Sequence, residues 1–134
     1  MAGNLKSMRH MLLAEVHRLT VTRADIDGPN GITLDRALGE AAGFVEFEKI
    51  EVTNASNGAR FSAALAFGEP GSGTVAVDGA AAHLARLSDI ITLSSYGWLK
   101  EKRAPKHQPV RVSVDSDNAV LPAFAVPKLK KNPV

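Results

Sequence analysis

The chain has 134 residues, of which 16 are basic and 14 acidic, giving a net charge of +2. This length is enough for one compact domain with a real core, and the balanced charge gives no sign of the clustered Lys/Arg surface that binds nucleic acid. The absence of cysteine excludes disulfides, thiolate catalysis and Cys-based metal sites. No apolar run reaches the roughly 20 residues of a membrane span, and no signal-peptide pattern opens the chain. We therefore expect a cytoplasmic protein with no membrane or nucleic-acid partner.

The first half of the chain predicts a long strand, a turn and a helix. Alternating side chains along residues 11–22 predict the strand. A dense turn cluster, Asp-Gly-Pro-Asn-Gly, follows at residues 27–31, and its Asn-Gly pair is a strong hairpin signal because both residue types tolerate positive φ. Residues 35–42 are predicted to form a short helix that ends at Gly43 as its C′ residue.

The second half predicts short strands joined by turns. Turns are expected at residues 57–58 and 69–73, a charged loop at 100–108, and a small Ala-rich helix at 79–87. The further strands are predicted at residues 50–54, 60–67, 74–77, 89–96 and 110–114. Many short strands with two brief helices are typical of a small closed barrel, so we predict a mainly β fold.

Nothing in the chain marks a domain boundary. There is no internal repeat and no linker long enough to divide domains. We predict a single domain over residues 1–134, with the barrel at about 9–122 and a flexible C-terminal tail at 123–134. Four His residues without Cys give no metal-ligand spacing, so no metal site is expected.

Seven stretches follow one another in a fixed order without large gaps. They are VHRLTVT (16–22), ADI (24–26), AAG (41–43), NGARFS (57–62), VDGAAAH (77–83), DIITLSSYG (89–97) and PVRV (109–112). No single stretch is diagnostic, but together they resemble bacterial aspartate 1-decarboxylase. The resemblance implies a double-psi β-barrel assembled as a homotetramer, with active sites between neighbouring subunits.

The resemblance also implies a prosthetic group made from the chain itself. Family members cleave themselves between a Gly and a Ser, and the Ser becomes an N-terminal pyruvoyl group. Counting from the His-Arg motif, these two positions fall on Asn30 and Gly31. Glycine has no hydroxyl, so neither the acyl shift nor the later elimination could occur here, and we expect no cofactor. Gly71-Ser72 is a true Gly-Ser pair in a different turn, where family members often carry one too, so we expect no cleavage there.

Other positions also depart from the family pattern. Most of the changes replace a large side chain by a small one or alter its charge. They are Glu15 for a Lys, Gly28 for a Tyr, Ala63-Ala64 for a Thr-Tyr pair, Asp78 for an Asn and Thr92 for an aliphatic residue.

The retained and altered positions together predict the site. The residue matching Arg60 clamps a substrate carboxylate in the family, a task that suits a guanidinium because its fork matches a carboxylate. Glu15 and His17 are two apart on a strand and share a face, so the carboxylate could orient the imidazole as an acid or base. We predict His17, Glu15 and Asp78 as catalytic. The predicted substrate-binding residues are Arg60, Arg18, Gly79, Ala80, Ala81 and Thr92.

One interpretation is a repurposed enzyme with a widened pocket. Decarboxylation of an α-amino acid needs an electron sink, which a cofactor usually supplies. We therefore expect cofactor-independent acid–base chemistry on a carboxylate-bearing small molecule larger than aspartate, such as cyclisation, isomerisation, elimination or β-keto acid decarboxylation. Such a lyase, isomerase or cyclase would differ from a conventional aspartate 1-decarboxylase, and specialised metabolism is one setting for it.

Two alternatives remain open. The chain could be a non-catalytic barrel that binds a metabolite or joins a true aspartate decarboxylase in mixed tetramers. It could also be a genuine aspartate decarboxylase, in which case it should be found cleaved into two fragments with a reactive carbonyl group.

Overall fold

The structure is a computed structural model that describes residues 7–29 and 31–122. Asn30, on which the counted cleavage position falls, and the predicted tail at 123–134 lie outside the described residues. The division into one barrel and a tail therefore stays a prediction.

The predicted mainly β fold is confirmed. Within the described residues, eight strands form one sheet in the order β2-β6-β3-β5-β4-β7-β1-β8, an architecture consistent with a double-psi β-barrel. The strands are β1 (Met8–Thr20), β2 (Arg23–Asp25), β3 (Gly31–Asp35), β4 (Lys49–Asn54), β5 (Arg60–Gly68), β6 (Val75–Asp78), β7 (Ile90–Lys100) and β8 (Val110–Ser113). The helical elements of the described residues are α2 (Arg36–Ala42) and the 3-10 turns η1 (Gly79–His83) and η2 (Ala104–Lys106).

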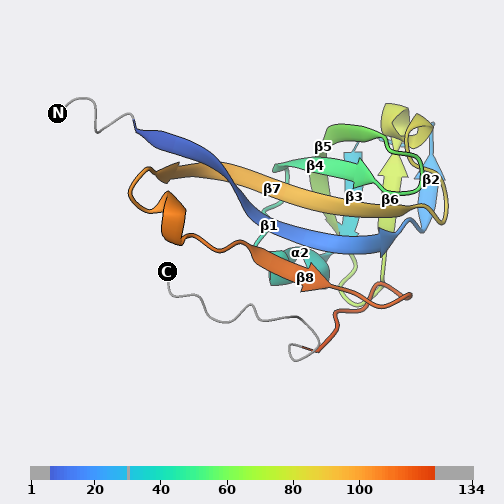
Figure 1. Ribbon diagram of the computed structural model, residues 1–134. Coiled ribbons are helices and arrows are strands. Elements are labelled where there is room, and N and C mark those ends of the chain that lie inside the picture. Colours follow the sequence, from blue (N-terminus) through green and yellow to red (C-terminus); the bar gives the residue numbers. More distant parts are fainter. Residues whose placement is uncertain (1–6, 30, 123–134) are drawn as a thin grey trace.

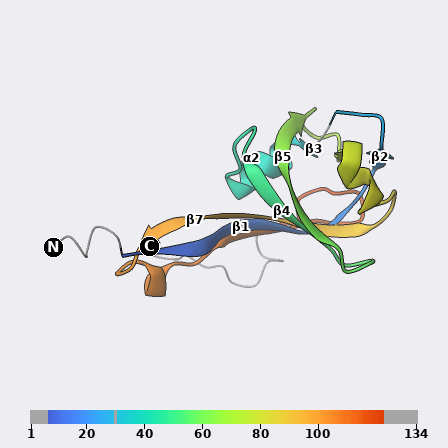
Figure 2. The ribbon, with the colours of Figure 1, turned by 90° about the horizontal axis from the view of Figure 1, so that it is seen from above.

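Strands β1 and β7 are the longest elements. They pair antiparallel from Met8 opposite Lys100 to Thr20 opposite Ile90, and β8 joins the other edge of β1 in parallel. Figure 1 shows β1 and β7 running side by side across the molecule, with α2 close to β8. Seen from above in Figure 2, α2, β3 and β5 stand on one side of the β1–β7 ribbon.

Alternate side chains of the strands fill the interior of the barrel. The largest side chains with almost no exposed surface are Leu19, Ile32, Leu34, Leu38, Ile50, Leu65, Ile91 and Leu93. Each such burial contributes about 1.5–3 kcal/mol relative to an exposed side chain. The residues come from β1, β3, α2, β4, β5 and β7, so the core ties nearly every element to the others.

The predicted helix at 35–42 is confirmed, and its ends follow from two residues. The Asp35 carboxylate accepts the backbone N–H of Ala37 at 2.8 Å, which satisfies a free donor of the first turn. Gly43 ends the helix at φ 79, a left-handed conformation that glycine adopts without a Cβ clash. Asp35 also accepts the N–H groups of Gly71 and Gly73. The same buried carboxylate therefore links the predicted turn at residues 69–73 to the start of the helix.

The predicted Ala-rich helix at 79–87 is wrong beyond its first turn, because only η1 forms. The Leu84 carbonyl accepts side-chain N–H groups from Asn54 and Asn57. The Asp89 carboxylate accepts the backbone N–H of Arg86. These contacts satisfy backbone groups that an α-helix would have paired internally, and the segment turns away instead.

The prediction for residues 11–31 is wrong in its topology. The strand that contains the His-Arg motif, β1, ends at Thr20 and not at residue 22 as predicted. Strands β2 and β3 were not predicted. They do not pair as a hairpin, since β2 lies parallel to β6 on one side while β3 lies antiparallel to it on the other. Gly31 is already the first residue of β3.

Candidate functional site

The His-Arg motif lies at a bulge in β1. The register of β1 against β7 shifts between Val16 and Leu19, and Arg18 has φ 61. A residue of this kind in a left-handed conformation is strained, and such strain tends to collect at functional sites. The bulge exposes both His17 and Arg18 to solvent. Bulges re-aim side chains in this way beside active sites.

Thr92 of β7 joins the two motif residues. Its hydroxyl oxygen accepts the backbone N–H of Arg18 at 3.3 Å and lies 3.4 Å from Nδ1 of His17. The structure therefore brings three of the predicted site residues together around one oxygen. Because the hydroxyl already accepts from Arg18, its own proton is free to point at the imidazole nitrogen.

A polar row extends from Thr92 across two further positions of the sheet. Thr53 of β4 stands opposite Thr92 on one side and opposite Arg60 of β5 on the other. Side chains directly opposite one another share a face, and neighbouring strands are about 4.8 Å apart. Arg60 therefore originates roughly 10 Å from Thr92 on the same face, and its side chain is exposed. We call His17, Thr92, Thr53 and Arg60 the polar row.

Glu15 has a different partner from the expected one. Its carboxylate lies 3.6 Å from the Arg111 guanidinium of β8, and its side chain is 21% exposed. No hydrogen bond or ion pair joins Glu15 to His17 in the part of the chain that the structure describes. A role for Glu15 in orienting the imidazole thus stays a prediction without a direct contact behind it.

Asp78 lies in the other half of the sheet and is also paired. Its backbone stands between Asp25 of β2 and Gly31 of β3. Its carboxylate is 3% exposed and accepts two hydrogen bonds from Arg23, at 2.7 and 3.3 Å. The hydrogen bond and the charge of Asp78 raise the pKa of the Arg23 guanidinium above its ordinary value.

Arg23 and Thr53 are absent from the predicted site. A cationic partner for Asp78 could have been expected, because its carboxylate lies between a buried strand and a Gly-Ala turn and a buried charge needs a partner. Arg23 is that partner. Thr53 gives no signal in the sequence, since its place follows only from the register of β4 against its two neighbours.

The predicted substrate-binding turn directly follows Asp78. Gly79 is buried at φ 73 and begins η1, so the turn needs the conformational freedom of glycine there. Ala80 is exposed and Ala81 half-buried. The turn belongs to the Asp78 side of the sheet, because it continues β6.

Gly31, on which the counted serine position falls, does not fit a pyruvoyl group, because it has no side chain from which one could form. Gly31 has φ +129, and a Cβ there would lie 2.8 Å from the carbonyl oxygen of Ala64. That approach is closer than real Cβ atoms make, and the contact is with backbone, which cannot swing away. A serine is therefore disfavoured at this position by both its Cβ and its φ.

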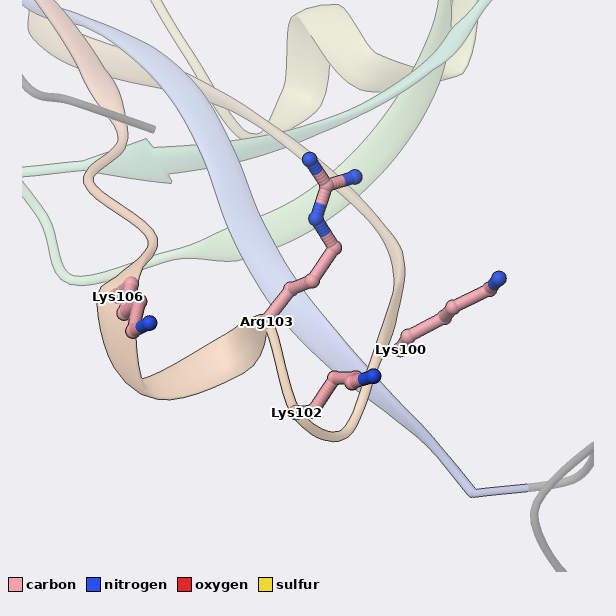
Figure 3. A pocket seen from close by; sticks show the side chains of 4 residues that line it. All are labelled: Lys100, Lys102, Arg103 and Lys106. Carbon is pink, nitrogen blue, oxygen red and sulfur yellow. The ribbon is translucent and has the colours of Figure 1, made fainter.

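A hollow of about 560 Å³ lies elsewhere, between the outer part of β7 and the turn that follows it. Four cationic side chains line it and point in different directions (Figure 3): Lys100, Lys102, Arg103 and Lys106. All four are exposed, and no residue of the polar row is among them. We therefore treat the hollow as an open cationic surface separate from the candidate site.

The match to known proteins covers nearly the whole described chain. Residues 7–121 match the family model described as aspartate decarboxylase. The chain belongs to the aspartate decarboxylase family. Within this family it is 40% identical to the aspartate 1-decarboxylase of Corynebacterium efficiens over 85% of this chain and 84% of that protein. The corresponding enzymes of Clostridium acetobutylicum and Myxococcus xanthus are also 40% identical, over 83% and 86% of this chain and 87% and 89% of their own lengths.

These relatives correct one expectation. We expected an enzyme set apart from conventional aspartate 1-decarboxylases. That expectation is wrong, because four members of the aspartate decarboxylase family that carry this name are each 40% identical to the chain over 82–86% of its length. The family is one of lyases, and the chain is a member of it.

The described residues hold neither a membrane-spanning helix nor a ready metal site. Residues 7–29 and 31–122 contain no helix long and apolar enough to cross a membrane. In the same residues no group of three or more His, Asp or Glu side chains is arranged to hold a metal ion.

Proposed function

We propose that this member of the aspartate decarboxylase family is a decarboxylase, a lyase that removes CO2 from a small carboxylate bound along the polar row. The observation that carries the proposal is the 40% identity to relatives named aspartate 1-decarboxylase over most of both chains. L-Aspartate is therefore the first substrate to test.

The polar row supplies the groups that binding and protonation need. Arg60 is exposed and always charged, and its fork can hold a carboxylate by two hydrogen bonds. His17 has one ring nitrogen beside Thr92, which leaves the other to deliver a proton to the carbon that loses CO2. The span from Arg60 to Thr92, roughly 10 Å, suits a small molecule held at one end and protonated at the other.

Gly31 favours a second candidate, a substrate that carries its own carbonyl group. In a β-keto acid the C–C bond to the carboxylate breaks, CO2 leaves, and the electron pair passes into the neighbouring carbonyl to give an enolate. Protonation at carbon then yields the ketone. This route needs no group made from residue 31, where the backbone contact with Ala64 disfavours a serine. Both candidates are decarboxylations, but L-aspartate has no carbonyl placed to accept the electron pair and would need a separate electron sink, whereas a β-keto acid needs none.

We also propose a homotetramer in the cytoplasm. The β1–β7 ribbon and the start of β8 expose large apolar side chains, which mark protein–protein contacts when they gather on one surface. They are Trp98 at 62%, Val110 at 47%, Tyr96 at 42% and Met8 at 39% exposure. Light scattering of the purified protein would test the assembly, and a monomer would contradict it.

The function is tested by offering the purified protein L-aspartate and a series of small β-keto acids, with CO2 release and product mass as readouts. Release of β-alanine supports the first candidate, and a ketone formed faster than in buffer supports the second. His17→Gln should abolish either reaction. Arg9→Gln is the matched control, because within residues 7–29 and 31–122 Arg9 pairs with exposed Glu101, far from the polar row. A protein that binds these acids but releases no CO2 would be a non-catalytic barrel, and the proposal would fail.

A further inference from the structure

The connection between β2 and β3 rests on two close contacts of glycine. A Cβ on Gly28 would lie 3.0 Å from Cβ and 3.1 Å from Cγ of Asp78. A Cβ on Gly31 would lie 2.8 Å from the Ala64 carbonyl oxygen. The space that larger side chains would need at both positions is already filled by other parts of the barrel.

Asp78 occupies the first of these spaces, and Arg23 keeps it there. The Asp78 side chain is 3% exposed, so its carboxylate has little water to solvate it. The hydrogen bonds from Arg23 at 2.7 and 3.3 Å compensate for that loss. Both residues are also fixed through the backbone, since β2 and β3 pair with β6 on either side of Asp78.

We infer that this connection stays uncut and the chain remains one continuous polypeptide, because Gly31 has no hydroxyl for self-cleavage and a closed support of Arg23, Gly28, Gly31 and Asp78 leaves no room for a larger side chain there. The Asp78 carboxylate is bound by Arg23 and makes no cap hydrogen bond to the Gly79 turn, so it acts as part of this support. Residue 31 contributes a backbone contact and no prosthetic group. This inference bears on the substrate, because a chain without a prosthetic group offers L-aspartate no electron sink, whereas a β-keto acid carries its own.

The state of the chain is tested by intact mass of the freshly purified and the long-incubated protein. The expected result is one mass equal to the full sequence and no carbonyl that reacts with a hydrazine probe. Two fragments that meet between residues 30 and 31, the second carrying a reactive carbonyl, would overturn the inference. A cut between Gly71 and Ser72 would overturn the continuous chain equally, and Ser72→Ala would then identify that site. Mass is read without any assay of activity, so failure here is distinct from failure of the proposed function.

Substitutions at Gly31 test its close approach to the Ala64 carbonyl oxygen. Gly31→Ser and Gly31→Ala add the same Cβ, and only the serine adds a hydroxyl. Both should lower the melting temperature by the same amount, and neither should be cleaved. Gly58→Ala is the matched control for backbone strain, because Gly58 has φ +81 but nothing within 4 Å of the added Cβ. A Gly31→Ser protein that processes itself while Gly31→Ala stays whole would show that the connection is not closed.

Arg23→Gln tests the ion pair between Arg23 and Asp78 in this support. It leaves a buried carboxylate without its cation, which should lower the melting temperature by roughly 5 °C or more. Hydrogen exchange of the peptide covering residues 24–29 should accelerate as well. Arg9→Gln breaks an ion pair whose side chains are 61% and 52% exposed, and it should change neither value. Equal effects of the two substitutions would contradict a specific role for Arg23.

Discussion

One hydroxyl oxygen, Oγ1 of Thr92, lies 3.4 Å from Nδ1 of His17 and accepts the backbone N–H of Arg18 at 3.3 Å. The oxygen thus links the strained bulge of β1 to the imidazole that we assign as the proton donor. The arrangement makes Thr92 a positioning residue whose effect should appear through His17.

Replacing Thr92 by Val removes the link while keeping the branched shape that suits a strand. We expect kcat for the decarboxylated substrate to fall about 2- to 10-fold, which corresponds to the loss of one ordinary hydrogen bond. The melting temperature should hardly change, because water can satisfy the exposed N–H of Arg18. Nitrogen NMR of the His17 ring should show an altered balance between the two tautomers. Thr53→Val, on the neighbouring strand, is the control, and a tautomer balance unchanged by Thr92→Val would refute the positioning role.

Arg60 should govern binding more than turnover. Arg60→Gln removes the cation at the far end of the polar row, so KM should rise about 10-fold or more, as expected for the loss of a charge-assisted pair worth about 1.5–3 kcal/mol. Arg60→Lys keeps the charge but loses the bidentate geometry, so its KM should lie between those of the parent and of Arg60→Gln. Stability should be nearly unchanged, because Arg60 is exposed at the first position of β5. A drop in kcat at constant KM would place Arg60 outside carboxylate binding.

Local signals in the sequence predicted local structure well. The helix α2 was predicted because an Asp precedes it and Gly43 follows it, and both caps form as expected. The short strands β2 and β3 were not predicted, because their partner β6 lies more than 40 residues further along the chain. A strand of three residues has no pattern of its own, and only pairing at a distance stabilises it.

In the candidate site, too, single residues could be predicted from the sequence, but their arrangement could not. The resemblance marked His17, Arg60 and Asp78, but their grouping depends on sheet register. Register places His17 and Arg60 on one row and puts Asp78 in the other half, beside Arg23. The pairing of Asp78 with Arg23 could not be read from spacing, since the two residues are 55 positions apart.

Asp89 should make stability depend on pH in the acid range. Its carboxylate accepts the Arg86 backbone N–H at 2.9 Å and the Asn54 amide at 2.8 Å, and these bonds lower its pKa from the ordinary value of 3.8. Since the folded pKa is below the unfolded one, the contribution is complete above pH 3.8 and is lost as pH falls through the lower folded value. Urea unfolding should show Asp89→Asn less stable than the parent at neutral pH by no more than about 1 kcal/mol, because solvent screens the charge and the asparagine oxygen can still accept both bonds. That gap should close in acid, and a gap of constant size would contradict the assignment.

Asn118 should be among the least replaceable polar residues of the barrel. It is 2% exposed, its side-chain oxygen accepts the Thr20 N–H at 2.8 Å, and its amide donates to the carbonyls of Thr20 and Gly73, each at 2.9 Å. Asn118→Ala leaves these three backbone groups without a partner, so unfolding in urea should show a loss of about 2–4 kcal/mol. The positive φ of 62 adds strain for alanine.

Asn118→Gly separates the two causes, because glycine tolerates the conformation but restores none of the hydrogen bonds. It should remain almost as unstable as Asn118→Ala if the side-chain bonds dominate. Asn57→Ala is the comparison at an exposed site, where water can replace the lost bonds to Leu84 and Ala59, and it should cost less than about 1 kcal/mol. Near-parental stability of Asn118→Gly would instead assign the effect to backbone conformation.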